Sequence, residues 1–257
     1  MITAPDSGRP SISVVVPARN ESENLPRLLG EIGEALESRS FEIIVVDDGS
    51  DDDTENTLRS YAYSHGYLRV IHHHNSCGQS CSVRSGLLHA RGEFIVTIDG
   101  DGQNDPAYIP ALIGALEGAA PAVALAAGQR VGRQASLYKR YASKAANAIR
   151  GALLKDRTRD SGCGLKVIRR DVFLKLPYFD SWHRFIPALV LREGYEITHV
   201  DVVDRQRQFG RSNYGIFDRA LIGALDLFGV WWLRRRREKI PKLDELELRP
   251  QKELELS

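Results

Sequence analysis

The sequence has no marked excess of either charge and no long apolar run. Among its 257 residues, 35 lysines and arginines are balanced by 34 aspartates and glutamates, so overall charge does not indicate nucleic acid as a partner. A membrane-spanning helix needs about 20 apolar residues, and the longest candidate, 222–233, is shorter and contains Asp226. The composition is that of a globular protein, large enough for one α/β domain or two small ones.

Cysteine is scarce. The three cysteines, Cys77, Cys81 and Cys163, and the lack of a recognisable signal peptide exclude a disulfide scaffold and predict a reducing compartment. Cys77 and Cys81 are four residues apart, but no second cysteine pair completes a tetrahedral zinc site. Three histidines at 72–74 would alternate between the faces of a strand, so they cannot all serve one site. Neither pattern predicts zinc.

The common nucleotide-binding loops are also missing. No Gly-x-Gly-x-x-Gly follows the first expected strand, and no Gly-Lys-Ser/Thr loop occurs. A nucleotide bound by this chain would therefore be held by acids and a metal ion, and not by a glycine-rich phosphate cradle.

Apolar strands and amphipathic helices alternate along the first half of the chain. Strands are expected at 11–17, 41–46, 68–71, 93–98 and 122–127, and helices at 25–36, 53–64, 79–90 and 106–117. A later strand is expected at 196–203 and a last helix at 216–237. This alternation predicts a single α/β domain over residues 11–237 with a mostly parallel central sheet. Residues 1–10 form a polar tail and residues 238–257 a charged, loose one.

Acidic residues stand where the strand at 93–98 ends. Asp99 and Asp101 point the same way along an extended chain, so their repulsion favours a cation between them. With the amide oxygen of Gln103 they make a ligand set suited to Mg²⁺ or Mn²⁺, and Gly100 allows close approach of a ligand to the backbone. The alternative is a plain turn, because Asp-Gly-Asp-Gly is also good loop chemistry. The strand at 41–46 ends in two more acids, which favours a site.

Basic residues dominate the second half. Between positions 130 and 170, twelve lysines and arginines stand against two acids, which fits either a solvated surface or one that receives phosphate. The loop at 205–215 carries three arginines and suits a lid over a diphosphate. The helix at 216–237 ends in aromatic residues and four arginines, so its apolar stripe fits either core packing or an anchor on anionic lipid.

Five motifs taken together resemble one family over residues 12–237. They are Val-Pro-Ala-Arg-Asn-Glu at 16–21, Val-Val-Asp-Asp-Gly-Ser at 45–50, Asp-Gly-Asp-Gly-Gln-Asn-Asp-Pro at 99–106, Asp-Ser-Gly-Cys-Gly at 160–164 and His-Arg-Phe at 183–185. The chain resembles the family 2 glycosyltransferases of the polyprenyl-phosphate branch, akin to dolichol-phosphate mannosyltransferase and bacterial undecaprenyl-phosphate sugar transferases.

The resemblance implies a GT-A (Rossmann-like) fold and inverting transfer of one sugar. The donor would be a UDP- or GDP-sugar, the acceptor an undecaprenyl or dolichyl phosphate, and the cofactor Mg²⁺ or Mn²⁺. The protein would then work in the cytoplasm, peripherally on the inner face of the cytoplasmic membrane, through direct contact or a membrane-spanning partner. Homo-oligomerisation is left open.

The resemblance also implies roles for individual residues. The nucleoside would be held by Pro17, Arg19, Glu21 and Asp47, with Gly100 beside the ligand. The catalytic set would be Asp99, Asp101, Arg130 and Arg207, and the metal ligands Asp101 and Gln103. Donor phosphates would contact Arg130, Arg207 and Asn213, and the lipid phosphate Arg140 and Ser143. Relatives often carry tyrosine at the position of Arg19 and lysine at that of Asn213, and many have C-terminal spanning helices.

A phosphate acceptor is already anionic, so this reaction needs no general base. Consistently, the segment 179–187, where other family 2 enzymes carry an acidic base, offers only Asp180 and His183. Two alternatives remain: a soluble glycosyltransferase acting on a sugar or protein hydroxyl, and a non-catalytic protein that binds nucleotide sugars. The absence of Gln-x-x-Arg-Trp, a mark of processive polysaccharide synthases, argues against chain polymerisation.

Overall fold

The computed structural model describes residues 9–131, 150–156, 158–206 and 216–236. Its core is a seven-stranded sheet in the order β3-β2-β1-β4-β6-β5-β7. The strands are β1 Ile12–Ala18, β2 Phe41–Asp47, β3 Leu68–His72, β4 Phe94–Thr97, β5 Val123–Arg130, β6 Lys166–Arg169 and β7 Glu196–Val202. Only β6 runs antiparallel to its neighbours, β4 and β5. The predicted mostly parallel sheet is confirmed.

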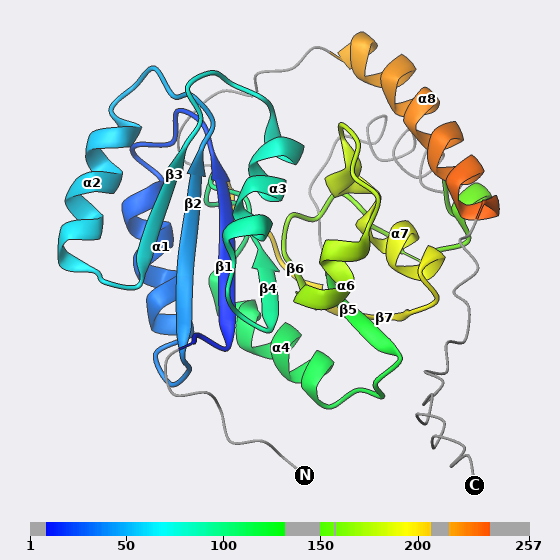
Figure 1. Ribbon diagram of the computed structural model, residues 1–257, viewed down its shortest axis with the longest axis horizontal. Coiled ribbons are helices and arrows are strands. Elements are labelled where there is room, and N and C mark those ends of the chain that lie inside the picture. Colours follow the sequence, from blue (N-terminus) through cyan, green and yellow to red (C-terminus); the bar gives the residue numbers. More distant parts are fainter. Residues whose placement is uncertain (1–8, 132–149, 157, 207–215, 237–257) are drawn as a thin grey trace, which may run out of the picture.

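Helices cover both faces of this sheet (Figure 1). They are α1 Leu25–Ala35, α2 Thr54–Ser64, α3 Gln79–His89, α4 Ile109–Glu117, α6 Arg170–Lys175, α7 Ile186–Arg192 and α8 Ile216–Arg235, with short 3-10 helices η1 Pro106–Tyr108 and η2 Trp182–Arg184. The predicted helices at 25–36, 53–64 and 79–90 are therefore confirmed. The one expected at 106–117 is present as η1 followed by α4.

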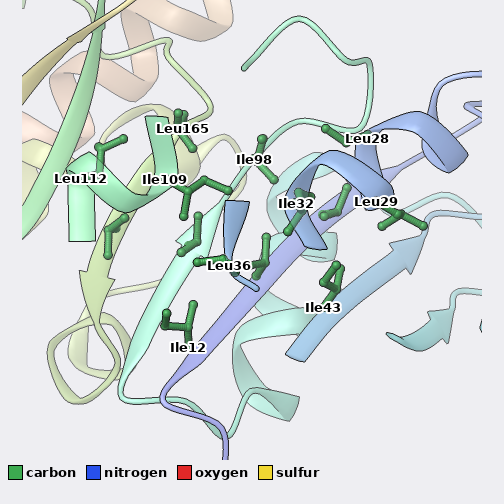
Figure 2. Packing of buried hydrophobic residues seen from close by; sticks show 14 of the residues in the cluster. Ile12, Leu28, Leu29, Ile32, Leu36, Ile43, Ile98, Ile109, Leu112 and Leu165 are labelled. Carbon is green, nitrogen blue, oxygen red and sulfur yellow. The ribbon is translucent and has the colours of Figure 1, made fainter. Parts of the chain in front are cut away.

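Successive residues of β1 enter two different cores, because side chains alternate across a strand. Val14 and Val16 belong to the first core, together with residues of α1 and α4, and Val15 belongs to the second, together with residues of α3, α6 and α7. Figure 2 shows the first core, where Leu28 and Ile32 of α1 lie over the sheet. Burial on both faces explains why these strands read as continuous apolar runs.

β1 ends one residue later than expected. The strand expected at 11–17 ends at Pro17, but β1 continues to Ala18, paired with β2 up to Asp47. On its other side, β1 pairs with β4 only as far as Val15. Pro17 therefore lies where one neighbouring strand has ended, a place that tolerates the missing N–H group.

The candidate functional residues lie at the end of the sheet where the parallel strands reach their carboxyl ends. The parallel strands β1, β2, β4 and β5 all end there, and the antiparallel strand β6 begins there, because Lys166 pairs with Thr97 at the end of β4. The carboxyl ends of parallel strands are the usual ligand site of open α/β sheets.

Helix α8 (Figure 1) packs beside α7, and its apolar side chains differ in exposure. Val230 is buried in the second core, whereas Leu225, Phe228 and Trp232 are exposed. Core packing therefore explains only part of the apolar stripe predicted for this helix. In the part of the chain that the structure describes, we find no helix with the length and apolarity needed to cross a bilayer.

Candidate active site

Asp99 lies among the carboxyl ends of the parallel strands, directly after Ile98. Its Oδ1 accepts a hydrogen bond of 2.8 Å from the side-chain amide of Gln79, which is the first residue of α3. Burial, followed by the negative charge of Asp101, raises the pKa of Asp99 to about 6. The two acids therefore interact, as the sequence predicted.

Asp101 belongs to a tight turn. Its Oδ1 accepts a hydrogen bond of 3.1 Å from the backbone N–H of Gln103, and Gly102 between them has φ of +70°, a conformation that favours glycine. The carbonyl of Gln103 in turn accepts a bond of 2.8 Å from the backbone of Arg205. The turn alternative thus describes the backbone correctly, and it also presents the acids that a cation would need.

A cavity of about 140 Å³ opens beside Asp99. It is bounded by Pro17 of β1, Thr97 of β4, Lys166 of β6 and the turn at 161–164. This volume is below the roughly 300–1,000 Å³ of a pocket that encloses a drug-sized ligand. The cavity is therefore large enough for one small polar group and not for a whole drug-sized ligand.

Lys166 is a site residue that sequence reasoning missed. Its side chain is buried, and its amino group donates a hydrogen bond to the carbonyl of Cys163. It also interacts electrostatically with Asp99. Burial lowers the pKa of this lysine. The signal was available in principle: if 166–169 is an antiparallel strand, its first residue must lie at the edge where the parallel strands end.

His183 and Trp182 connect the cavity to α3. Ser80 and His183 share a hydrogen bond of 2.7 Å through Nδ1, and the Trp182 indole donates to the carbonyl of Ser80. Desolvation, then the charges of Arg184 and Lys166, lowers the pKa of His183 to about 3, so the imidazole is neutral near pH 7. Trp182 and Phe185 are buried and belong to the second core.

Of the residues predicted to hold or adjoin a nucleoside, some lie beside the cavity and others contact neighbouring side chains. Pro17 lines the cavity, and Gly100 is packed so closely on β1 that a Cβ there would lie 2.9 Å from the Pro17 carbonyl. Arg19 donates to Ser76 at 3.1 Å. Glu21 is buried and accepts from Asn24 at the start of α1, which gives it a structural task as well.

Asp47 and Asp48 organise the end of β2. Asp47 accepts from Ser50 and pairs with His72 at 2.9 Å. Asp48 would have a raised pKa from burial alone, but hydrogen bonds from Cys77, His73 and the neighbouring loop lower its pKa to about 2. This carboxylate holds the loop between β3 and α3 in place.

Arg130 ends β5 with two acidic partners. It forms two hydrogen bonds to Asp160 and a third contact to Asp204 at 3.2 Å. Burial opposes its charge, but these ion pairs raise its pKa. To bind a donor phosphate, Arg130 would have to share or exchange these carboxylates. The other predicted phosphate contacts, Arg140, Ser143, Arg207 and Asn213, lie outside the described residues.

Comparison with known proteins identifies the family. Residues 13–176 match Glycosyl transferase family 2, and the chain belongs to this family. Dodecaprenyl-phosphate galacturonate synthase of Rhizobium johnstonii is 33% identical over 234 residues, covering 89% of this chain and 68% of its own length. Undecaprenyl-phosphate 4-deoxy-4-formamido-L-arabinose transferase of Sodalis glossinidius is 31% identical over 80% of this chain and 63% of its own length. The chain thus spans about two thirds of these relatives.

Solved structures share the fold. Glucosyl-3-phosphoglycerate synthase from Mycobacterium tuberculosis, in complex with Mn²⁺, UDP and glucosyl-3-phosphoglycerate, aligns with a TM-score of 0.65 and 20% identity over 90% of this chain and 82% of its own. A mannosyltransferase from Pyrobaculum calidifontis, in complex with GDP-Man and Mn²⁺, aligns with a TM-score of 0.65 and 21% identity over 91% and 67%. At these identities the likeness shows the fold, and the predicted GT-A architecture agrees with it.

Proposed function

We propose that this protein is an inverting glycosyltransferase that moves one sugar from a UDP- or GDP-sugar to a polyprenyl phosphate. The observation that carries the proposal is the acidic pair Asp99 and Asp101 beside a cavity at the strand edge. Family membership and relatives named for undecaprenyl- and dodecaprenyl-phosphate substrates support it.

A divalent cation fits the site formed by Asp99, Asp101 and Gln103 at the carboxyl ends of the strands, which we call the acidic edge. Burial, followed by repulsion from Asp101, raises the pKa of Asp99, and a bound cation would relieve that repulsion. Carboxylate and amide oxygens are the donors that Mg²⁺ and Mn²⁺ prefer. Asp101 and Gln103 would hold the ion, with Asp99 close by. The bound ion would supply electrostatic stabilisation of the departing nucleoside diphosphate. Solved structures of the same fold contain Mn²⁺.

The side chains around the cavity favour an acceptor that is already anionic. Of the described residues that line the cavity, only Asp99 carries a carboxylate, and its place beside the expected metal ligands makes it a partner of the cation. His183 is a weak base, because burial lowers its pKa to about 3, and its Nδ1 is hydrogen-bonded to Ser80. Asp180 is exposed and accepts from the backbone of Ser181. Lys166 and Arg184 also line the cavity, and the guanidinium of Arg184 favours a phosphate.

The membrane contact in this proposal belongs to α8. Its exposed Leu225, Phe228 and Trp232 are followed by Arg235 and Arg236, which lie 4.3 Å and 5.6 Å over the rings of Trp231 and Trp232. Aromatic groups beside cations suit the interface of an anionic leaflet. We place the protein peripherally on the inner face of the cytoplasmic membrane, through this helix or a membrane-spanning partner.

The test is single-turnover sugar transfer in the presence of Mn²⁺. A panel of UDP- and GDP-sugars is offered with a polyprenyl phosphate and, in parallel, with the polyprenol of the same length. We expect product from the phosphate and little from the alcohol. Efficient transfer to the alcohol, or to a soluble sugar, would favour the hydroxyl-acceptor alternative. Donor binding without transfer to any acceptor would favour a non-catalytic protein.

A further inference from the structure

Three metal-binding side chains meet between β3 and α3, away from the acidic edge. His73 directly follows β3, Cys77 lies in the connecting loop, and Cys81 is in the first turn of α3. One ligand atom from each of the three residues lies within 4.8 Å of the other two. Cys77 is exposed and the other two are partly exposed, so a cation could reach them from solvent.

The distances are close to those that zinc requires. With Zn–S of about 2.3 Å and Zn–N of about 2.0 Å, the ligand atoms of a tetrahedral site lie roughly 3.5–3.8 Å apart. Because the three atoms lie within 4.8 Å of one another, the group has to contract by at most about 1 Å. The exposed side chain of Cys77, whose thiol contacts the carbonyl of Asn75 at 3.4 Å, is free of core packing and can supply that movement.

Asp48 orients the imidazole in the way that metal sites favour. His73 Nδ1 lies 2.8 Å from Asp48 Oδ1, and a carboxylate on one ring nitrogen fixes the tautomer that presents the other nitrogen to a metal. That other nitrogen, Nε2, lies 2.9 Å from the Ser85 hydroxyl, which a metal would replace. The same carboxylate accepts from the backbone of Cys77, so one acid positions two of the three residues.

We propose that His73, Cys77 and Cys81 form a second cation site, which binds Zn²⁺ or a similarly thiophilic divalent ion with solvent completing the coordination. Two thiolates and an imidazole select such ions over the Mg²⁺ or Mn²⁺ expected at Asp101. The sequence did not predict this site, because its ligands come from two separate patterns. Two are the spaced cysteines, and the third is His73, one of the three consecutive histidines. The proposal does not rest on the proposed function.

The location couples the site to the acidic edge. Cys77 and Cys81 flank Gln79 and Ser80, which contact Asp99 and His183. A cation bridging the two thiolates would hold this segment in the conformation that places those contacts.

The test is zinc binding by the full-length protein, freed of metal by chelation and kept reduced with a phosphine. Zn²⁺ affinity is measured by competition with a chromophoric chelator, and Co²⁺ is used to detect thiolate ligation by its charge-transfer absorbance. We expect about one Zn²⁺ per chain, and protection of Cys77 and Cys81 from alkylation when zinc is present. Cys77→Ser, Cys81→Ser and His73→Gln should each weaken zinc binding at least as much as the roughly 10–100-fold seen for lost outer-shell partners.

Two controls isolate the site. His74→Gln removes the exposed neighbouring histidine and should leave zinc affinity unchanged, and Asp101→Asn should do the same because it alters only the acidic edge. Cys77→Ser changes an exposed side chain, so it reports on binding even if Cys81→Ser fails to fold. Wild-type zinc affinity in both Cys77→Ser and His73→Gln, or absence of the cobalt–thiolate band in the wild type, would overturn the proposal.

Discussion

Gly164 lies against the carboxylate of Asp99. A Cβ built on Gly164 would lie less than 3.0 Å from the carboxyl carbon and both oxygens of Asp99, a separation that real side chains do not adopt. The turn at 161–164 therefore needs glycine at this position for the acid to occupy its place, and the motif at 160–164 acts on the site through shape.

We expect Gly164→Ala to displace Asp99 and reduce sugar transfer by about 100-fold, because catalytic groups misplaced by an ångström lose activity on that scale. Overpacking should also cost about 1–3 kcal/mol of stability. Transfer kinetics and thermal unfolding measure the two effects. Gly151→Ala is the matched control, since a Cβ there meets nothing within 4 Å. Full activity of Gly164→Ala would show that the position of Asp99 does not matter.

Asp101→Asn tests the proposed metal ligand. The change is isosteric and Asp101 is partly exposed, so the fold should persist while turnover falls by 10²–10³-fold or more, on the order expected for loss of one electrostatic contact to the transition state. Activity is titrated with Mn²⁺ after EDTA treatment. Asp171→Asn, on the exposed surface of α6, should behave as the parent. Undiminished turnover of Asp101→Asn in EDTA would end the metal hypothesis.

The architecture could be predicted because β1, β2 and β4 are apolar on both faces, so their sequences identify them as buried strands without knowledge of their neighbours. The positions of Asp99 and Asp101 follow from the same pattern. Lys166 was not placed, because its position follows only once β6 is known to run antiparallel between β4 and β5, a pairing between segments distant in sequence. For the same reason, the two carboxylate partners of Arg130 were not predicted.

His183 predicts a dependence of stability on pH. Its folded-state pKa is lowered to about 3, against about 6.5 in the unfolded chain, so the unfolded state binds an extra proton between these values. The contribution of His183 to the free energy of unfolding is therefore fully present above pH 6.5. It decreases as the pH falls toward 3, with a slope on the order of 1 kcal/mol per pH unit.

We expect the free energy of unfolding of His183→Gln to depend less on pH than that of the parent between about pH 4.5 and pH 6.5. This range covers about two pH units directly below the ordinary histidine pKa. The measurement is denaturant unfolding of parent and variant across that range. His74→Gln, which replaces an exposed histidine, is the control and should follow the parent curve. Parallel curves for His183→Gln and the parent would show that the imidazole does not stay neutral in the folded protein.

Membrane binding by α8 is tested with liposomes. Each cation near an anionic surface contributes about 1 kcal/mol, so replacing Arg235 and Arg236 with glutamine should weaken binding to anionic liposomes, and salt should do the same. Phe228→Ser with Trp232→Ser should weaken it through lost apolar contact. Tyr63→Ser on α2, where Tyr63 is 95% exposed, controls for the loss of a surface aromatic. Equal co-sedimentation with neutral and anionic liposomes would favour a membrane-spanning partner.

The last prediction concerns the missing general base. If the nucleophile is a phosphate, His183→Ala and Asp180→Asn should each keep kcat within about tenfold of the parent, whereas loss of a true base typically costs about 10²–10⁴-fold. The structure supports this expectation, since Asp180 is exposed and His183 is hydrogen-bonded to Ser80.

The decisive comparison is transfer to polyprenyl phosphate and to the matched polyprenol, each with the parent and Asp180→Asn. A neutral hydroxyl must lose its proton as it attacks, but a phosphate oxygen need not, so only transfer to the alcohol should depend on a base. Arg140→Ala, outside the described residues, is expected to raise the KM for the phosphate acceptor without abolishing donor binding, because it removes a charge-assisted contact. Efficient transfer to polyprenol that requires Asp180 would replace the phosphate acceptor with a hydroxyl one.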